Sequence, residues 1–372
     1  MAAGVLVLLG SGETAPGMTR VHREVLSRIT DLTAVNLDTP YGFQLNVPQM
    51  SQKLEEYFAT SLRVELTTLH LASYARASQV ERALFKERVR QATYVFAGPG
   101  SPTWALAQWG PLDLAEDLAA VLDAGGTVCL ASAAALTAGA LTAPIYEIYK
   151  VGVEDPTWVP GLDLLSACGL SCVVIPHFDN AEGQNYDTRF CYLGEPRLAL
   201  LEGQLPTGVA TLGVDEHTAV ILDRASDTLS VRGRARAHWR LGGETRSIAA
   251  GETVPLDELR RRGPDAGTPT RPNGPESPLP MSSRGPLALA EIAAGGGPEA
   301  TRALARLVQL AEGGGEGTIE PTRLVEGVLA TRRAARAAGQ YALADQLRDA
   351  LVAAGIEVHD GPSGTSWSLR PA

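Results

Sequence analysis

The stretch GGTVCLASAAALTAGALTAP, residues 125–144, decides the fold. Thr127 to Leu130 form a short apolar run that is typical of a buried strand, and the small residues after Ser132 favour a helix. A strand that turns sharply into a helix lifts the side chain at the corner above the edge of the sheet. The pattern therefore predicts a nucleophile elbow with Ser132 at the corner. A buried serine that caps the helix is the alternative.

Strand-like runs alternate with amphipathic helical stretches around this corner. The expected strands are Val5–Leu9, Thr33–Leu37, Val64–Leu71, Thr93–Ala97 and Thr127–Leu130, and the expected helices include Val21–Ile29 and Gln79–Gln91. This alternation predicts an α/β fold: a flavodoxin-like, doubly wound, mostly parallel sheet with helices on both faces. We expect further strands between residues 208 and 248 to extend or edge that sheet. The loops at Gly10, Gly98 and Ser132 all follow strands, so they can converge where such folds place their sites.

Composition restricts the class of protein. The 372 residues, of which 45% are hydrophobic, allow about two or three domains. The formal net charge of -10 argues against a general binder of nucleic acids or anionic membranes. The four cysteines form no CxxC pair and are expected to be buried, reduced thiols. With no basic leader and no run long enough to span a bilayer, the sequence predicts a cytoplasmic protein.

The chain divides at a change in composition. Residues 1–255 carry the α/β pattern, and residues 256–286 are crowded with proline, glycine and serine. That middle segment cannot bury enough apolar surface to fold alone and is predicted to be a linker. Residues 287–372 show helical periodicity and are predicted to form a small, mainly helical domain.

Four segments carry a family resemblance. They are VLVLLGSGETAPG at 5–17, TYVFAGPGSPTWALAQWG at 93–110, VVIPHFDNAEGQNYDTRFCYLGEPRL at 173–198 and TLGVDEHTAVIL at 211–222. In this order and spacing they resemble the cyanophycinase and peptidase E family of serine hydrolases, which has a class I glutamine amidotransferase-like fold. The resemblance covers roughly the first 240 residues. It implies a serine-dependent peptidase or amidase for a small peptide-like substrate, aspartyl peptides included. We expect neither a metal nor another cofactor.

A serine hydroxyl needs a base within hydrogen-bonding reach. His177 ends a predicted buried strand, which brings its ring to the sheet edge that holds Ser132, and the resemblance also places the catalytic histidine there. His217 is the competitor. His22 is expected on an exposed helix, and His70 as a plain core residue.

The third member of a triad holds the imidazole tautomer. Glu147 follows the elbow at about the separation that the family resemblance implies for its acidic residue. Glu154 and Asp155 are alternatives, and a salt bridge to Lys150 would give Glu147 a structural role instead.

Backbone N–H groups of Gly100 and Ala133 are the expected oxyanion hole, and Gly98 lets the same loop approach a substrate carbonyl. The polar cluster after the base is expected to bind substrate, or else to be a solvated loop; it contains Asn180, Glu182, Gln184, Asn185 and Arg189. The family's elbow usually reads Ser-Ala-Gly-Ala, whereas Ser132 is followed by three alanines.

The end of the chain carries a second resemblance. The stretch ARAAGQYALADQLRDALVAAGIEVHDGPSGTSWSL, residues 335–369, resembles the extreme C-terminal segment of cysteinyl-tRNA synthetases. No HIGH-like or KMSKS-like signature occurs, which argues against aminoacylation. Residues 321–372 hold six arginines against five acidic residues, so phosphate contacts should be weak. The tail is expected to contact tRNA, another protein or a second copy of the chain as a homodimer.

Two rival functions remain from the sequence. The first is a binding or regulatory protein that keeps the fold without catalysis. The second is amide hydrolysis by a cysteine, as in glutamine amidotransferases. The second is disfavoured because Cys129 precedes the elbow, inside the strand, while Ser132 occupies the corner.

Overall fold

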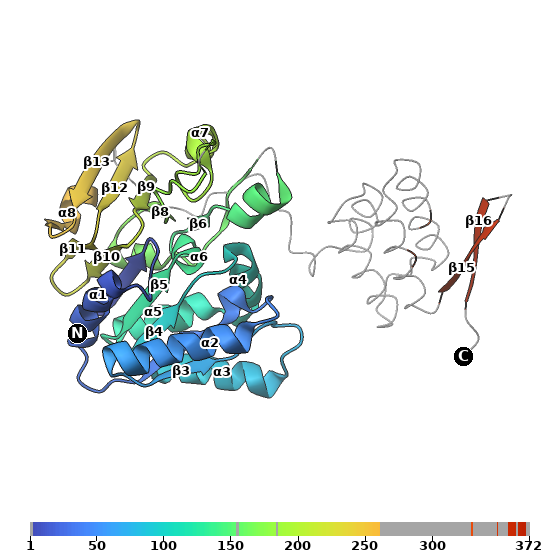
Figure 1. Cartoon of the computed structure of the whole chain (residues 1–372), viewed down its shortest axis with the longest axis horizontal. Coiled ribbons are helices and arrows are strands. Elements are labelled where there is room, and N and C mark those ends of the chain that lie inside the picture. Colours follow the sequence, from blue (N-terminus) through green and yellow to red (C-terminus); the bar gives the residue numbers. More distant parts are fainter. Residues whose placement is uncertain are drawn as a thin grey trace. The chain divides into compact units, whose positions relative to one another are not determined.

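The computed structural model describes residues 3–153, 156–183, 185–260, 329 and 348, and also 356–361 and 364–369. The chain forms two compact units, Met1–Thr270 and Arg271–Ala372 (Figure 1). In the second unit, β15 (Ile356–Gly361) and β16 (Gly364–Leu369) form an antiparallel hairpin. The helical stretches expected in this unit, and residues 261–286 of the expected linker, lie outside the described residues.

An eight-stranded sheet organises the first unit, in the order β14-β11-β10-β1-β5-β4-β2-β3. Its members are β1 (Val5–Leu9), β2 (Ala34–Leu37), β3 (Leu66–Leu69), β4 (Tyr94–Ala97), β5 (Thr127–Ala131), β10 (Thr218–Asp223), β11 (Thr228–Gly233) and β14 (Thr253–Pro255). The strands β1, β5, β4, β2 and β3 run parallel. The predicted mostly parallel α/β fold is therefore confirmed.

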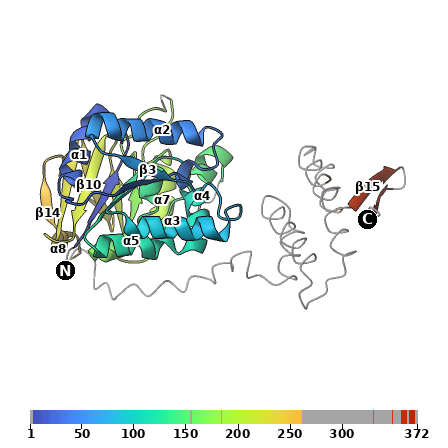
Figure 2. The same cartoon turned by 90° about the horizontal axis from the view of Figure 1, so that it is seen from below.

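Helices cover both faces of this sheet (Figure 2). One face carries α1 (Pro16–Leu26) and α2 (Val47–Tyr57), and the other carries α3 (Gln79–Gln91) and α5 (Leu114–Asp123). Alternate residues of β1 serve the two layers: Val7 belongs to the core cluster that includes Val21 of α1, whereas Leu8 belongs to the cluster that includes Val89 of α3. Every residue of β1 is buried, which explains its continuous apolar run.

A second, four-stranded sheet lies beside the first in the order β13-β12-β9-β8. Its strands are β8 (Cys172–Ile175), β9 (Ala210–Val214), β12 (Arg236–Leu241) and β13 (Glu244–Ala249). The strands β8 and β9 are parallel, so their carboxyl ends lie together. Of the late strands expected to extend or edge the main sheet, β10 and β11 extend it, whereas β9, β12 and β13 belong to this second sheet; β14 also joins the main sheet.

Shorter elements complete the unit. They are α4 (Pro102–Trp109), α6 (Ala133–Leu136), α7 (Gly194–Glu202), β6 (Leu141–Thr142), β7 (Val159–Pro160), and the single turns η1 (Thr39–Tyr41), η2 (Phe58–Leu62), η3 (Gly110–Leu112), η4 (Glu147–Val151) and η5 (Leu164–Cys168). In the part of the chain that the structure describes, every helix is too short or too polar to cross a bilayer.

The start of the expected linker belongs to the folded unit. Residues Leu256–Arg260 form α8, in which Leu256 and Leu259 are buried. The Arg260 guanidinium donates to the carboxylate of Asp227 and to the carbonyl of Cys168. These five residues bury apolar surface and form paired contacts, so they extend the α/β unit beyond the expected boundary at residue 255.

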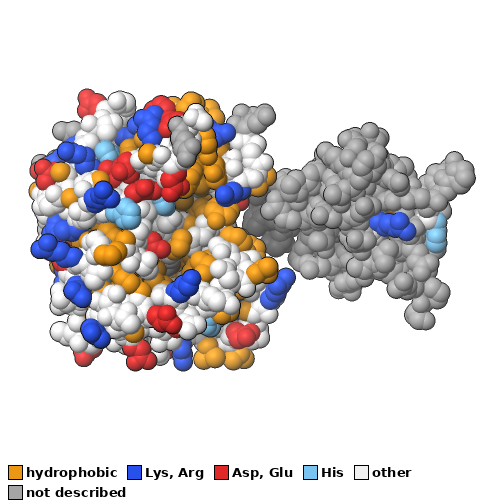
Figure 3. All heavy atoms as spheres, in the orientation of Figure 1, with side chains coloured by type: hydrophobic (Ala, Val, Ile, Leu, Met, Phe, Trp, Pro, Cys, Tyr) orange, Lys and Arg blue, Asp and Glu red, His pale blue; other side chains and the backbone are white. Residues whose placement is uncertain are grey.

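Charges of both signs are interspersed over the face of this unit that Figure 3 shows. Several arginines of the unit form ion pairs, including Arg240 with Glu202 at 2.8 Å and Arg232 with Glu24 at 3.1 Å.

Candidate active site

The elbow forms where β5 ends. Ser132 follows Ala131 directly and has φ 52° and ψ -116°, a backbone conformation that residues other than glycine rarely adopt. Its own N–H donates to the carbonyl of Leu9 at the end of β1, at 3.0 Å. This main-chain hydrogen bond holds the corner against β1. The hydroxyl of the half-buried Ser132 takes no part in that bond and can contact other side chains.

A histidine and a carboxylate extend from this hydroxyl. His177 Nε2 lies 2.8 Å from Ser132 Oγ, and His177 Nδ1 lies 2.9 Å from Glu216 Oε1. A carboxylate only accepts hydrogen bonds, so Nδ1 carries the proton and Nε2 is free to accept one from the serine. The three side chains therefore form an ordered serine, histidine and glutamate relay.

The two sheets explain how these residues meet. Ser132 follows β5, His177 lies two residues after β8, and Glu216 lies in the turn between β9 and β10. His177 N–H donates to the carbonyl of Gly10 after β1, at 3.2 Å. All three residues thus stand at the carboxyl ends of parallel strands, where α/β folds place their sites.

Glu216 is held in its ionised form. Burial raises the pKa of Glu216, but the hydrogen bonds from His177 and Asn180, together with electrostatic attraction to the neighbouring histidine rings, outweigh burial, so the pKa of Glu216 lies below its usual value. Asn180 Nδ2 donates to Glu216 Oε1 at 3.0 Å, and the Glu216 N–H donates to Asp179 at 2.7 Å. Glu216 is therefore held in place through both its side chain and its main chain.

Glu147 does not occupy the position expected of the third residue. Its Oε1 accepts a hydrogen bond from Thr103 Oγ1 at 2.7 Å, at the start of α4. The carboxylate on His177 is that of Glu216, which was not among the expected site residues. Glu216 follows a buried strand in the segment TLGVDEH. This position at the end of a strand is the feature of the sequence that could have identified Glu216 as a site residue. Glu154 and Asp155 lie outside the described residues.

The expected oxyanion loop lies beside the elbow. The N–H of Ala134 donates to the carbonyl of Gly98 at 3.3 Å, which joins the two segments directly. Gly100 has φ +143°, and a Cβ there would lie 1.9 Å from the carbonyl oxygen of Pro40. Ala133 is the first residue of α6, so its N–H has no acceptor within the helix.

Most of the expected substrate-binding side chains have protein partners. Asn180 is buried and holds Glu216, so its amide supports the relay rather than facing a substrate. Arg189 donates to both carboxylate oxygens of Asp187, at 2.9 and 2.8 Å, which engages its guanidinium. Asn185 is exposed, and its N–H donates to the carbonyl of Gly183. Gln184 lies outside the described residues.

Three other histidines that the sequence analysis weighed, His217, His22 and His70, have surroundings of their own. His217 packs against Gly12, where a Cβ would meet its Nδ1 at 2.1 Å. His22 is only 2% exposed, which corrects the expectation of an exposed position. The side chain of His70 is 67% exposed and bonds the buried carboxylate of Asp38 at 2.7 Å, so it is not a core residue.

Strained backbone and aromatic rings border His177. His177 itself has φ 47°, and the consecutive residues Phe190, Cys191 and Tyr192 have φ of 59°, 56° and 67°. The N–H of Cys191 donates to the carbonyl of His177 at 3.1 Å, so this left-handed turn supports the base. The Tyr192 ring lies 6.4 Å from the His177 ring, centre to centre. Such strain concentrates at functional sites because the surrounding structure enforces it.

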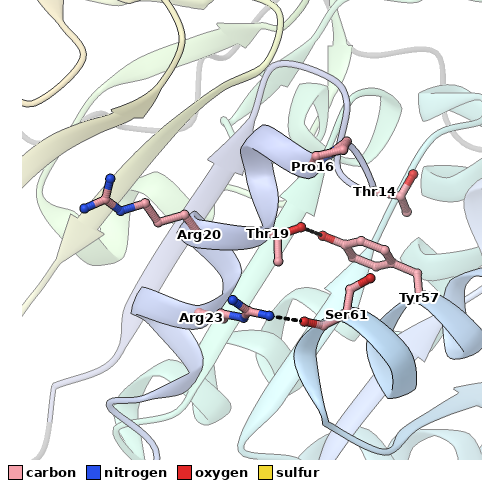
Figure 4. A pocket seen from close by; sticks show the side chains of 7 residues that line it. All are labelled: Thr14, Pro16, Thr19, Arg20, Arg23, Tyr57 and Ser61. Atoms are coloured by element: carbon pink, nitrogen blue, oxygen red, sulfur yellow. Dashed lines mark hydrogen bonds between the residues drawn. The ribbon is translucent and has the colours of Figure 1, made fainter.

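A surface pocket of about 620 Å³ lies elsewhere, between α1 and the α2–η2 segment (Figure 4). It is lined by Thr14, Pro16, Thr19, Arg20, Arg23, Tyr57 and Ser61. Arg23 donates to the carbonyl of Ser61, and the Thr19 and Tyr57 hydroxyls bond each other at 3.0 Å. None of the relay residues lines this pocket.

The fold matches that of a solved peptidase. A crystal structure of a peptidase from an acI-B1 actinobacterium superimposes with a TM-score of 0.55 and 20% identity, covering 68% of this chain and 97% of that one. The α/β unit therefore has the fold of this peptidase. A candidate peptidase E protein from Listeria monocytogenes EGD-e also aligns, with a TM-score of 0.41 and 13% identity, over 67% of this chain and 99% of that one.

The C-terminal segment is similar to a different kind of protein. Residues 322–367 match the family described as the cysteinyl-tRNA ligase anticodon binding domain. The cysteine–tRNA ligase of Beutenbergia cavernae is 54% identical over 61 residues, or 15% of this chain and 13% of the ligase. That of Salinibacter ruber is 46% identical over 65 residues, or 17% and 13%. The chain therefore spans only 13% of the length of these ligases.

Proposed function

We propose that the α/β unit is a serine-dependent peptidase or amidase that acts on a small peptide-like substrate. The relay from Ser132 through His177 to Glu216 is the observation that carries this proposal, with contacts of 2.8 and 2.9 Å. Three residues from separate segments meet with the donors and acceptors that acyl transfer requires. A protein that only kept the fold would not need this arrangement.

The geometry supports a reaction in two halves. Ser132 Oγ attacks the scissile carbonyl carbon while its proton passes to His177 Nε2, and Glu216 offsets the charge of the imidazolium. The backbone N–H groups of Gly100 and Ala133 would stabilise the oxyanion. His177 then gives its proton to the leaving amine, and the C–N bond breaks. Water, deprotonated by the same imidazole, hydrolyses the acyl-enzyme and regenerates Ser132.

A cysteine mechanism has less support. Cys129 is fully buried within β5, and burial raises the pKa of its thiol to about 12. The thiolate is the reactive form of cysteine, so this side chain is a poor nucleophile at neutral pH. The other free cysteines of the described chain, at positions 168, 172 and 191, are also buried.

Hydrolysis of a panel of dipeptides and amino-acid amides tests the proposal. Ser132→Ala and His177→Ala should each lower the rate by about 10⁴-fold or more, because the relay acts as a unit. The thermal midpoint should change little, since Ser132 makes its main-chain contact through its N–H. Ser226→Ala, on an exposed turn, serves as the control and should retain full activity. An unchanged rate in Ser132→Ala would exclude this function.

A second function, contact with tRNA, is favoured for the tail by its match to an anticodon binding domain. We propose that residues 322–367 contribute this contact. Binding of tRNA by the full chain and by a chain ending at Thr270 should be compared at several salt concentrations. The full chain should bind tRNA and the shortened chain should not, and the affinity should fall as salt rises because phosphate contacts release counterions. Equal binding by both chains would contradict this proposal.

A further inference from the structure

The surface pocket between α1 and the α2–η2 segment has polar, positively charged walls (Figure 4). Apart from Pro16, it is lined by two arginines and four hydroxyl-bearing residues: Arg20, Arg23, Thr14, Thr19, Tyr57 and Ser61. None of these lining residues, all of which the structure describes, is acidic. The volume of about 620 Å³ lies within the range of roughly 300–1,000 Å³ that small-molecule sites occupy. The pocket therefore has the size of a ligand site and the charge to hold an anion.

Arg23 is anchored on one wall of the pocket. Its Nη2 donates to the carbonyl of Ser61 at 2.6 Å, which joins α1 to η2 across the pocket (Figure 4). A guanidinium carries five N–H donors in a fixed fork, so this contact leaves further donors for another acceptor. Among the described residues, no carboxylate pairs with Arg23. Its positive charge is therefore held in place without a counter-ion.

Arg20 supplies a second charge from the same side of α1. It precedes Arg23 by three residues, and residues with this spacing are neighbours on a helix surface. Arg20 is exposed and, within the described part of the chain, forms neither a hydrogen bond nor an ion pair. In Figure 4 its side chain points away from the hydroxyl groups, and the rotatable bonds of arginine allow it to turn toward a ligand. The nearby Glu24 does not neutralise it, because that carboxylate pairs with Arg28 and Arg232.

The wall opposite α1 presents a hydroxyl pair. Tyr57 OH and Thr19 Oγ1 lie 3.0 Å apart, and whichever hydroxyl donates, the other keeps a proton that it can give to a ligand. Burial raises the pKa of Tyr57 by more than the hydrogen bond with Thr19 and the attraction to Arg23 lower it, so the phenol stays protonated at neutral pH. The Tyr57 ring packs edge-on against the buried His22, with centres 6.1 Å apart. This packing holds the phenol in position.

We propose that this pocket binds the phosphate group of a small phosphomonoester. Such a group carries a charge of about −1.5 to −2 at pH 7 and three strong acceptor oxygens, which match two guanidinium groups and the hydroxyls beside them. Arginine also binds phosphate through two parallel N–H···O bonds, which adds geometric specificity. None of the relay residues lines the pocket, so this site does not depend on the hydrolase function.

Three probes that share a benzene ring test the ligand class. Phenyl phosphate is a dianion above about pH 6, phenyl sulfate has nearly the same shape but is a monoanion, and benzyl alcohol is neutral. Calorimetry of the full chain at low salt and pH 7.5 should show one site for phenyl phosphate, with at least about tenfold weaker binding of phenyl sulfate and none of benzyl alcohol. Inorganic phosphate should displace phenyl phosphate. Absence of saturable binding of phenyl phosphate, or equal affinities for the phosphate and the sulfate, would overturn the inference.

Substitutions place the binding in this pocket. Arg23→Gln removes the charge but keeps an amide N–H that can donate to the Ser61 carbonyl, and it should weaken phenyl phosphate binding by about ten- to a hundredfold. Arg20→Gln should weaken it by about three- to tenfold, because this side chain must first turn toward the ligand. Both variants should keep the thermal midpoint of the wild type.

Arg88→Gln is the matched control. Arg88 is an exposed arginine of α3, on the opposite face of the main sheet, so its removal takes away the same charge far from the pocket. It should leave the affinity for phenyl phosphate within about twofold of the wild type. If Arg23→Gln weakens binding no more than Arg88→Gln does, phenyl phosphate binds elsewhere and the inference is overturned.

Discussion

Glu216 is the residue on which the proposed mechanism depends most after the nucleophile and base. Replacing Glu216 by Gln should lower kcat by about 10² to 10⁴-fold, because an amide can present a donor to Nδ1 and favour the wrong imidazole tautomer. The loss should be smaller than that of His177→Ala, which removes the base itself. Kinetics of both variants with one neutral substrate measure this, and a Glu216→Gln variant as active as the wild type would remove Glu216 from the relay.

Gly100 tests the oxyanion loop. A Cβ at this position would collide with the carbonyl of Pro40 at 1.9 Å, and φ +143° is unfavourable for alanine. Gly100→Ala should therefore displace the loop and lower kcat by about 10² to 10³-fold. Gly17→Ala is the matched control, because nothing lies within 4 Å of its added Cβ. Equal activities of the two variants would show that the loop does not serve the reaction.

The sequence predicted the nucleophile and base positions more readily than the acid. Ser132 and His177 each end a strand, and the ends of buried strands are visible as breaks in apolar runs. The contact between His177 and Glu216 depends on the parallel pairing of β8 with β9, which no local pattern displays. The family resemblance favoured Glu147, but the Glu147 carboxylate accepts a hydrogen bond from Thr103 instead. The pairing of strands in the tertiary structure therefore decides which carboxylate contacts His177.

At the scale of elements, α1 contains a buried histidine with a measurable consequence. Burial lowers the pKa of His22 to about 4, although its hydrogen bond to the carbonyl of Glu13 opposes this. Between about pH 6.5 and 4 the unfolded imidazole is protonated while the folded one is not, so stability falls as the pH falls. The full effect is about 3 kcal/mol.

Denaturant unfolding of the wild type and His22→Gln at several pH values measures this contribution. The wild type should lose stability more steeply than the variant between pH 6.5 and 4, whatever the variant's stability at pH 7. Parallel curves for the two proteins would show that His22 is protonated equally in both states.

Element boundaries followed the sequence where a helix cap or a continuous apolar run marked them. The predicted helix Gln79–Gln91 coincides with α3, which begins with a capping box formed by Ser78 and Glu81. The late strands were harder, because alternating patterns do not show which sheet a strand joins. His22 was also misplaced, since a polar side chain on an amphipathic helix ordinarily faces water, whereas here it bonds Glu13 and Tyr94 internally.

At the scale of the whole molecule, the two units carry different resemblances and different expected roles. A chain ending at Thr270 should keep the thermal midpoint and the hydrolysis rate of the full chain within about twofold, because the relay and its supporting strands lie within the first unit. Calorimetry and kinetics of the two chains check this. Loss of hydrolysis in a shortened chain that remains folded would assign the tail a part in the reaction.

The most direct measurement of the central claim is covalent labelling. A fluorophosphonate probe reacts with an activated serine hydroxyl, so the protein should be labelled once, at Ser132, as mapped by mass spectrometry of the digested protein. Labelling should disappear in Ser132→Ala and fall strongly in His177→Ala, since the base no longer accepts the hydroxyl proton. Absence of labelling in the folded wild-type protein, or a label that maps to another residue and persists in Ser132→Ala, would contradict the account.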